Sequence, residues 1–246
     1  MNQLSPAQHD VVLITGASRG VGKATALLLA QRGCDIIVNY HSKHLRAEVV
    51  AHEIRALGRR ALLAQADLTS SVEVEAMLES AGREFGRVDV LILNASGGLE
   101  KGKPAEYAMQ LNLTAQVRLV DLSLKWMPRG GRIVFVTSHM AHFYGERGMV
   151  GPYEPVAASK YAGEQALRGR RAELAKHGIL LAIVSGDMIE GTITPRLLER
   201  MDRGMTAARR DRAGPLPTVA EFSRAIADAA TEETSGGDTI FVGTTL

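Results

Sequence analysis

The sequence contains a single cysteine, Cys34, and few aromatic residues, which make up 4% of the chain. One cysteine excludes an intrachain disulfide and a metal site built on a cysteine cluster. Neither sign of charge dominates, because 29 Lys and Arg face 27 Asp and Glu. The densest basic run, residues 209–212, is interrupted by Asp211. A nucleic-acid-binding protein usually carries a concentrated basic stripe, so we expect no nucleic-acid partner.

Long apolar runs are also missing from the sequence. No uninterrupted apolar stretch approaches membrane-spanning length, and residues 1–9 are polar and contain Pro6, unlike a signal peptide. We therefore expect a soluble, cytoplasmic protein without a membrane partner. The chain has 246 residues, of which 46% are hydrophobic, enough for one large core. No linker or repeat is visible, so we expect a single domain over residues 1–246.

Short apolar runs alternate with longer amphipathic ones along the chain. The apolar runs predict strands at residues 11–15, 35–39, 61–65, 88–93, 132–137, 179–184 and 239–242. The amphipathic runs predict helices at residues 21–32, 45–57, 70–85, 104–127, 154–176 and 219–230. Residues 187–217, rich in Gly, Pro, Met and Arg, predict an irregular stretch. Repeated strand–helix units predict an α/β, doubly wound Rossmann fold with a parallel seven-stranded sheet, although the pattern leaves the strand order open.

A glycine-rich segment, TGASRGVG, follows the first predicted strand and leads into a helix. Its glycines are Gly16, Gly20 and Gly22. Glycine permits a tight turn and lets the backbone approach a pyrophosphate, which then lies against the unpaired N–H groups of the helix N-terminus. The segment therefore predicts a dinucleotide site, and the alternative is an ordinary glycine-rich turn.

The same segment resembles the cofactor motif of the short-chain dehydrogenase/reductase family, and other family features recur in order along nearly the whole chain. Asp67 matches the acidic residue that holds the adenine, and residues 94–97, Asn-Ala-Ser-Gly, look like the family loop that lines the cofactor. Asn112 and Ser138 match the helix asparagine and the strand-end serine of the active-site tetrad. Singly, each has a plainer interpretation, as a helix cap, a turn residue or a buried polar group.

The end of the second predicted strand bears on cofactor choice. NAD-specific enzymes place a carboxylate there, which binds the ribose 2′-OH and repels a 2′-phosphate. Residues 39–43, Asn-Tyr-His-Ser-Lys, contain no acid, and Arg19 and Lys43 could pair with the phosphate. The sequence therefore favours NADP(H) over NAD(H).

The resemblance implies a full cofactor site and an oligomer. Because family members are usually dimers or tetramers built on the long fourth and fifth helices, we expect a homodimer or homotetramer. The implied cofactor-binding residues are Gly16, Ser18, Arg19, Gly20, Val21, Gly22, Tyr40, His41, Ser42, Asp67, Leu68, Asn94, Ala95, Ser96, Lys160, Ser185, Gly186 and Ile189.

The family's Tyr-x-x-x-Lys motif is only half present. Residues 158–160, Ala-Ser-Lys, match its end, and the resemblance implies that Lys160 holds the nicotinamide ribose and lowers the pKa of a catalytic tyrosine. Val156, however, stands in the tyrosine's place and cannot donate a proton. Tyr153 lies seven residues before Lys160, close to two helical turns, so both could project from one helix face.

The Tyr-(x)6-Lys spacing is similar to that of the divergent enoyl-acyl-carrier-protein reductase branch. Tyr144 falls about where that branch has a second aromatic residue, and the segment Val-Ser-Gly at 184–186 also looks like that branch. Alternatively, Tyr153 is a loop aromatic packed beside prolines. Pro155 fits the first turn of a helix, so helical geometry need not extend back to Tyr153. Tyr161, beside Lys160, would point about 100° away around the helix and is disfavoured.

Two further groups of residues have an open interpretation. His139 and His142 border the expected substrate, and a metal site from them is disfavoured because no carboxylate cluster accompanies them. Methionines and an isoleucine in the irregular stretch could form a mobile lid or pack in the core. The latter residues are Met188, Ile189, Met201 and Met205.

The resemblance implies a reductase in which Tyr153 supplies the proton, Ser138 orients the substrate carbonyl oxygen, Asn112 completes a proton relay and Lys160 anchors the ribose. We predict an NADP(H)-dependent oxidoreductase acting on an acyl-thioester-like substrate, with a slight preference for enoyl (C=C) reduction. The alternative reaction is reduction of a 3-oxoacyl or other ketone. The alternative of another class is a non-catalytic dinucleotide sensor, suggested by Val156.

Overall fold

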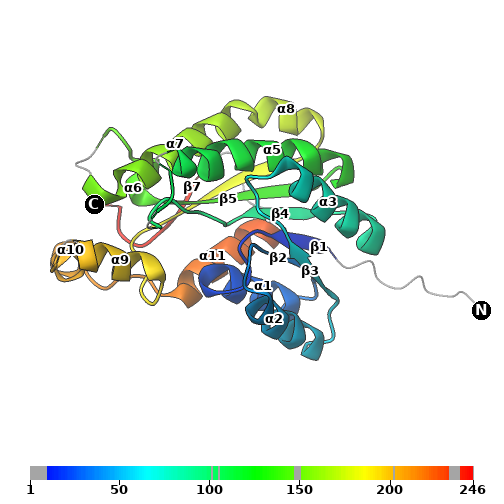
Figure 1. The fold of residues 1–246 in the computed structure, drawn as a ribbon, viewed down its shortest axis with the longest axis horizontal. Coiled ribbons are helices and arrows are strands. Elements are labelled where there is room, and N and C mark those ends of the chain that lie inside the picture. The colour runs from blue at the N-terminus through cyan, green and yellow to red at the C-terminus, as the bar shows by residue number, and fades with distance from the viewer. Residues whose placement is uncertain are drawn as a thin grey trace, which may run out of the picture.

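The structure, a computed structural model, describes residues 10–100, 102–104, 106–146, 151–201, 203–232 and 239–245, without the side chains of Pro152 and Met201. In this part of the chain, seven parallel strands form one sheet in the order β3-β2-β1-β4-β5-β6-β7 (Figure 1). The strands are β1 Val11–Ile14, β2 Asp35–Tyr40, β3 Ala61–Gln65, β4 Val90–Leu93, β5 Arg132–Ser138, β6 Leu180–Gly186 and β7 Thr239–Val242. The predicted doubly wound Rossmann fold is confirmed.

Helices connect the strands and cover both faces of the sheet. The α-helices are α1 Gly20–Gln31, α2 His44–Ala56, α3 Ser71–Phe85, α4 Tyr107–Met109, α5 Ala115–Ser123, α6 His139–His142, α7 Glu154–Gly169, α8 Arg171–Lys176, α9 Ile193–Met201, α10 Met205–Ala213 and α11 Val219–Thr231. The other helical turns are η1 Gln110–Thr114 (a π-helix), η2 Leu124–Trp126 and η3 Gly151–Tyr153 (both 3₁₀).

Two apolar cores lie on opposite faces of the sheet because successive strand residues point to opposite sides. In β1, Val11 and Leu13 belong to the core beneath α3, α5, α7 and α8, whereas Val12 and Ile14 belong to the core of α1, α2 and α11. Figure 1 shows these two helix layers on either side of the sheet. Burial on both faces explains why the strands read as continuous apolar runs. Each fully buried aliphatic side chain contributes about 1.5–3 kcal/mol.

The two longest predicted helices are divided in the structure. The one predicted at residues 104–127 begins at Tyr107, passes through the π turn η1 and ends in the 3₁₀ turn η2. The one predicted at residues 154–176 breaks at Arg170 into α7 and α8. Amphipathic periodicity alone does not show where a single π or 3₁₀ turn interrupts an α-helix, so the sequence predicted continuous helices.

The prediction of an irregular stretch at residues 187–217 is wrong, because α9 and α10 lie there. The glycines and prolines that suggested a loop stand at or near the helix ends. Pro195 falls in the first turn of α9, where its missing N–H has no intrahelical partner to lose. Gly204 and Gly214 flank α10 with φ of +88° and +79°.

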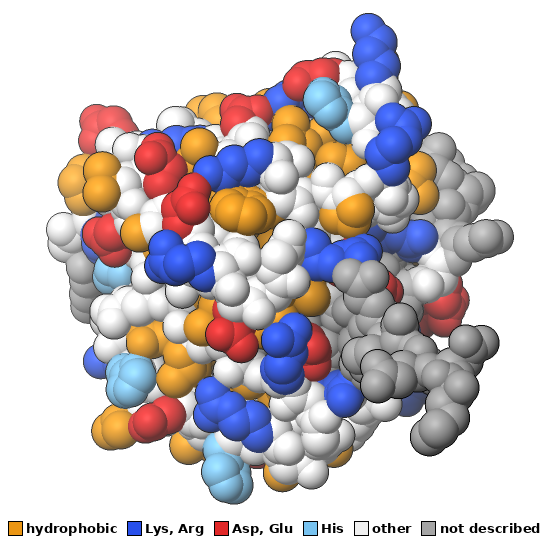
Figure 2. All heavy atoms as spheres, turned by 90° about the vertical axis from the view of Figure 1, so that its right-hand side faces the viewer, with side chains coloured by type: hydrophobic (Ala, Val, Ile, Leu, Met, Phe, Trp, Pro, Cys, Tyr) orange, Lys and Arg blue, Asp and Glu red, His pale blue; other side chains and the backbone are white. Residues whose placement is uncertain are grey.

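The surface agrees with the balanced composition. Figure 2 shows the right-hand side of Figure 1, where Lys and Arg side chains lie among Asp and Glu side chains. No concentrated basic stripe appears on this face. Within the described ranges, none of the helices combines the length and apolarity that a bilayer crossing requires.

Helix α3 approaches η2 so closely that Gly82 is required. A Cβ on Gly82 would lie 2.2 Å from an atom of the Trp126 ring. Real Cβ atoms do not come this near to another heavy atom, and the indole belongs to the large core on this face. Helix α3 therefore contains glycine, a poor helix former, at this position, because a larger residue would leave no room for the indole.

We predict that Gly82→Ala lowers the free energy of unfolding by about 1–3 kcal/mol, because the added methyl overpacks the Trp126 site. Gly169→Ala is the matched control, since a Cβ there meets nothing within 4 Å. It should be neutral or stabilise by up to about 1 kcal/mol through helix propensity. Urea unfolding followed by circular dichroism checks both values, and equal effects of the two changes would contradict this account.

Candidate active site

The loop between β1 and α1 has the backbone shape of an anion cradle. Gly16 and Gly20 have φ of +64° and +55°, a region that glycine enters without steric cost. Asn39, at the end of β2, accepts a hydrogen bond from the Gly16 N–H through Oδ1 at 3.2 Å. Arg19, the N-cap of α1, makes no side-chain capping bond, so the first N–H groups of the helix are left to a ligand or solvent.

Gly22 and Gly20 of this loop differ in the space that surrounds them. A Cβ on Gly22 would lie 2.6 Å from the carbonyl oxygen of Gly16 and 2.7 Å from Asn94 Nδ2. A Cβ on Gly20 would meet nothing within 4 Å. The loop is therefore closed toward the sheet and open outward at the helix start, an arrangement that fits a dinucleotide pyrophosphate.

Thr15 and Asn94 join this loop to the end of β4. The Asn94 and Ala95 N–H groups each donate to Thr15 Oγ1 at 2.9 Å, and that hydroxyl donates to the Ile92 carbonyl at 3.2 Å. Asn94 Nδ2 donates to the Thr15 carbonyl at 2.8 Å. The structure thus places Asn94 and Ala95 beside the glycine loop, which the Asn94 amide helps to hold, and their predicted contact with the cofactor stays a prediction.

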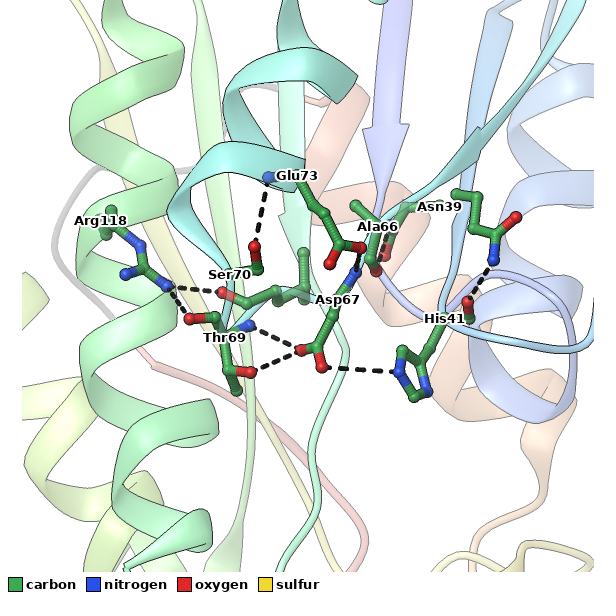
Figure 3. A network of polar contacts seen from close by, with 10 residues as sticks. Asn39, His41, Ala66, Asp67, Thr69, Ser70, Glu73 and Arg118 are labelled. Atoms are coloured by element: carbon green, nitrogen blue, oxygen red, sulfur yellow. Dashed lines mark hydrogen bonds and ion pairs between the residues drawn. The ribbon is translucent and has the colours of Figure 1, made fainter.

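Asp67 organises the loop after β3 (Figure 3). Its Oδ1 accepts hydrogen bonds from the N–H and hydroxyl of Thr69 at 2.8 and 2.7 Å, and its Oδ2 lies 3.5 Å from His41 Nε2. Arg118 of α5 donates to the carbonyls of Leu68 and Thr69. Burial by itself would raise the pKa of Asp67, but the Thr69 hydrogen bonds outweigh it and lower the pKa. An ionised carboxylate therefore lies beside the loop that follows β2.

The side chains that follow β2 divide into a buried tyrosine and an exposed polar group. Tyr40 is buried, and its hydroxyl lies 2.7 Å from His44 Nδ1. His41, Ser42 and Lys43 are exposed. The three exposed side chains can approach a nucleotide, although that of His41 also lies 3.5 Å from the Asp67 carboxylate.

Ser138 and Tyr153 lie together at the carboxyl end of β5. Their hydroxyl oxygens are 3.2 Å apart, and Ser138 Oγ also accepts from the Ala141 N–H at 3.3 Å. Tyr153 is 6% exposed and has helical backbone angles, φ −92° and ψ −11°, as the N-cap of α7. Helical geometry therefore does extend back to Tyr153. Burial raises the pKa of its phenol, and the bond to Ser138 partly opposes this, so the phenol stays protonated at neutral pH.

Val156 packs among apolar side chains. It is buried in a small cluster with Tyr153, Ala157 and Leu198. A Cβ on Gly98 would lie 3.1 Å from Val156 Cγ2, so the valine lies against the loop that follows β4. Apolar packing thus fills the position at which the family motif has its tyrosine, while the phenol beside Ser138 comes from three residues earlier.

Lys160 is buried on the same helix, with 9% of its surface exposed. Burial lowers its pKa from 10.5 to about 8, and the negative charge of Glu164 opposes the shift. Tyr161 points elsewhere, because its ring packs against Tyr144 with centroids 5.9 Å apart. The Tyr144 hydroxyl donates to Glu154 at 3.4 Å. Of the tyrosines on or beside α7, Tyr153 is thus the one that contacts Ser138.

Asn112, in the π turn, connects the loop after β4 with α7. Its Nδ2 donates to the Gly97 carbonyl and to Ser159 Oγ, both at 2.9 Å, and its Oδ1 accepts from the Gly97 N–H at 3.2 Å. A Cβ on Gly163 would lie 2.2 Å from the Asn112 carbonyl oxygen. The side chain therefore joins neighbouring segments, and its predicted part in a proton relay stays a prediction.

The residues predicted around the end of β6 lie in the core. Ser185 is fully buried, and its hydroxyl lies 2.8 Å from His139 Nδ1. Gly186 packs against Phe222 of α11, whose ring would be 2.7 Å from a Cβ there, and Ile189 belongs to the same core. The side chains of Ser185 and Ile189 are therefore engaged in packing.

Helix α9 covers the tyrosine. Leu198 is 1% exposed and packs in the cluster with Tyr153, and Met188 and Met205 lie against this cluster. The Met201 side chain lies outside the described structure. Met188 and Met205 therefore pack around the tyrosine cluster, as the core-packing interpretation expects, and a movement of this segment as a lid stays a prediction.

Sequence reasoning missed two polar residues of this region. Asn39 is a buried amide at the end of an apolar strand, and that contrast in the sequence was its signal. Glu164 is a fully buried carboxylate four residues after Lys160, and its charge on the apolar face of α7 could have revealed it.

Comparison with protein families and curated proteins yields consistent matches. Residues 10–201 match the family model described as short chain dehydrogenase. A hydroxynaphthalene reductase of Aspergillus fumigatus is 35% identical over 141 residues, which cover 54% of this chain and 51% of that protein. The chain thus matches about half the length of such relatives. A 1-cyclohexenylcarbonyl-CoA reductase of Streptomyces collinus is 32% identical over 196 residues, covering 76% of this chain and 68% of that protein.

Solved structures extend the similarity to the whole fold. A short chain dehydrogenase from Burkholderia cenocepacia in complex with NADP superposes with a TM-score of 0.82 and 27% sequence identity. The superposition covers 97% of this chain and 98% of the other.

We predict that Gly22→Ala weakens dinucleotide binding at least about tenfold, because the new Cβ would displace the Gly16 carbonyl and the loop above it. Titration of the protein with reduced nicotinamide nucleotides, followed by their fluorescence, measures the dissociation constant. Gly169→Ala serves as the control with the same chemical change far from the loop. Unchanged affinity in a folded Gly22→Ala protein would show that the loop does not hold the nucleotide.

Proposed function

The chain belongs to the short chain dehydrogenase family, and we propose that it is an NADPH-dependent reductase of the conjugated double bond in an acyl thioester. The observation that carries this proposal is the contact between two hydroxyls, 3.2 Å apart, of Ser138 at the end of β5 and Tyr153 at the start of α7, the helix that also carries the buried Lys160. A phenol thus lies beside the serine, although Val156 stands where the family motif has its tyrosine.

The glycine loop and the loop after β2 would hold the cofactor. Gly16, Gly20 and the N-terminus of α1 suit the pyrophosphate, and Arg19 and Lys43 suit a 2′-phosphate, since no carboxylate ends β2. The structural neighbour crystallised with NADP supports the same preference. When bound, NADPH supplies the hydride for the reduction.

Side chains of this protein would orient and protonate the carbonyl oxygen of the substrate. Tyr153 holds a proton on Oη, because burial keeps the phenol neutral, and can donate it toward the thioester carbonyl oxygen. Ser138 lies within hydrogen-bonding distance of that phenol and orients the same oxygen. Lys160 adds positive charge nearby and would hold the ribose. Leu198 and the methionines of the lid exclude water from this site.

Enoyl reduction is favoured by the position of the phenol. The Tyr153–Lys160 spacing resembles that of enoyl reductases, and the similar protein from Streptomyces collinus is named for reduction of an enoyl-CoA. Reduction of a ketone is the second candidate, favoured by the similarity to hydroxynaphthalene reductases. The contact of Tyr153 with Ser138 favours either enzyme over a non-catalytic dinucleotide sensor.

We predict that Tyr153→Phe reduces kcat for crotonyl-CoA at least about 100-fold while NADPH still binds, because a general acid contributes about this much. Loss of NADPH absorbance measures the rate. Tyr161→Phe, which changes a phenol packed against Tyr144, is the control and should retain activity. If the protein turns over acetoacetyl-CoA but not crotonyl-CoA, its activity is carbonyl reduction and not enoyl reduction. If it binds NADPH but turns over neither thioester, the result favours the non-catalytic sensor.

We also predict that Arg19→Ala and Lys43→Ala each raise the KM for NADPH about tenfold, because each removes a charge-assisted contact to the 2′-phosphate. The KM for NADH, which lacks this phosphate, should stay within a factor of about two. Steady-state kinetics with both cofactors measures the ratio. An equal increase in the KM for NADH would show that these side chains do not act through the 2′-phosphate.

A further inference from the structure

Glu164 of α7 is a carboxylate without solvent contact. Its exposed fraction is 0%, and its Oε1 lies 2.7 Å from His142 Nδ1 and accepts a hydrogen bond from Arg168 Nε at 2.8 Å. The other oxygen, Oε2, is buried and has no hydrogen-bond partner among the described residues. A buried carboxylate oxygen left without a partner is costly, so its retention calls for an explanation.

The two partners fix Glu164 rigidly. Arg168 also donates to Thr239 of β7 through Nη2, and the His142 ring packs edge-on against Phe143 and Phe241, with centroids 4.8 and 5.1 Å apart. The carboxylate is therefore held from α6, from its own helix and, through Arg168, from β7. Such a fixed charge acts on its surroundings without having to reorganise.

Lys160 lies one helical turn before Glu164, and both are on the buried face of α7. No hydrogen bond or ion pair joins the Lys160 ammonium to another described residue. Burial disfavours its charged form, and the carboxylate of Glu164 is the charge that opposes this effect. The carboxylate and the ammonium thus share one buried face of α7, four residues apart.

We propose that Glu164 is a positioning residue, fixed by His142 and Arg168 on the buried face of α7, whose negative charge favours the ammonium form of Lys160 on the same face. Its part in catalysis rests on the proposed reductase function, but its action on Lys160 does not. The charged or titratable groups around Glu164 are His142 from α6 and Arg168 and Lys160 from α7, while β7 contributes the neutral Thr239.

The test is the titration of Lys160 in Glu164→Gln, which removes the charge and keeps the shape. Protein labelled with ¹³C at lysine Cε is titrated by NMR, and Lys160→Arg identifies the signal by its disappearance. Without the carboxylate, burial acts unopposed, so the midpoint for Lys160 should fall by about one pH unit. Because the charged lysine is the active form, the alkaline fall in reductase activity should move to lower pH by the same amount.

Two variants make the result specific. Glu173→Gln removes an exposed carboxylate from α8 and should leave the Lys160 midpoint unchanged. Glu164→Asp keeps the charge one methylene farther away, so its midpoint should fall between those of the wild type and Glu164→Gln. If Glu164→Gln does not fold, Glu164→Asp decides, and a midpoint equal to that of the wild type would overturn the proposal.

The outcomes separate this inference from the proposed function. A lower Lys160 midpoint in a protein that reduces no thioester supports the action of Glu164 and contradicts the reductase. An unchanged midpoint in folded Glu164→Gln overturns the inference, even if the wild type is an active reductase.

Discussion

The hydrogen bonds between Thr15 and Asn94 hold together the region on which the rest of the site depends. β1 and β4 are neighbours in the sheet but are separated in sequence by β2 and β3, and the strand order reverses between them. Parallel strands diverge into separate loops at such a point, which opens a crevice at their carboxyl ends. The Thr15 hydroxyl binds two N–H groups of the β4 loop, and the Asn94 amide binds back to Thr15. These contacts set the floor against which Gly22 must fit.

The other half of the site depends on the burial of charge. Lys160 and Glu164 lie on one face of α7, where water is excluded and a neighbouring charge acts strongly. His142 and Arg168 hold Glu164 on this face, and the hydroxyls of Ser138 and Tyr153 lie together at the N-terminus of the same helix. Burial raises the pKa of the Tyr153 phenol and lowers the pKa of Lys160, so in both groups it disfavours the charged form.

Val156 stands where the family motif has its tyrosine, and a tyrosine from another position of the chain lies beside Ser138 instead. The valine completes an apolar cluster with Leu198, and the phenol comes from the helix N-cap. The 3₁₀ turn η3 gives Tyr153 a helical backbone just before α7 begins. Its side chain can therefore reach Ser138 although Pro155 follows within the first turn.

Local sequence determined the fold class, the strand positions and the glycine loop. Buried strands need apolar side chains on both faces, and a tight turn against a pyrophosphate needs glycine, so both leave direct marks in the sequence. The strand order, the π turn around Asn112 and the two helices α9 and α10 came only from the tertiary structure. They depend on which distant segments pack together, as Leu198 does on Tyr153. Glu164 was missed for a related reason, because one of its partners, His142, comes from another helix.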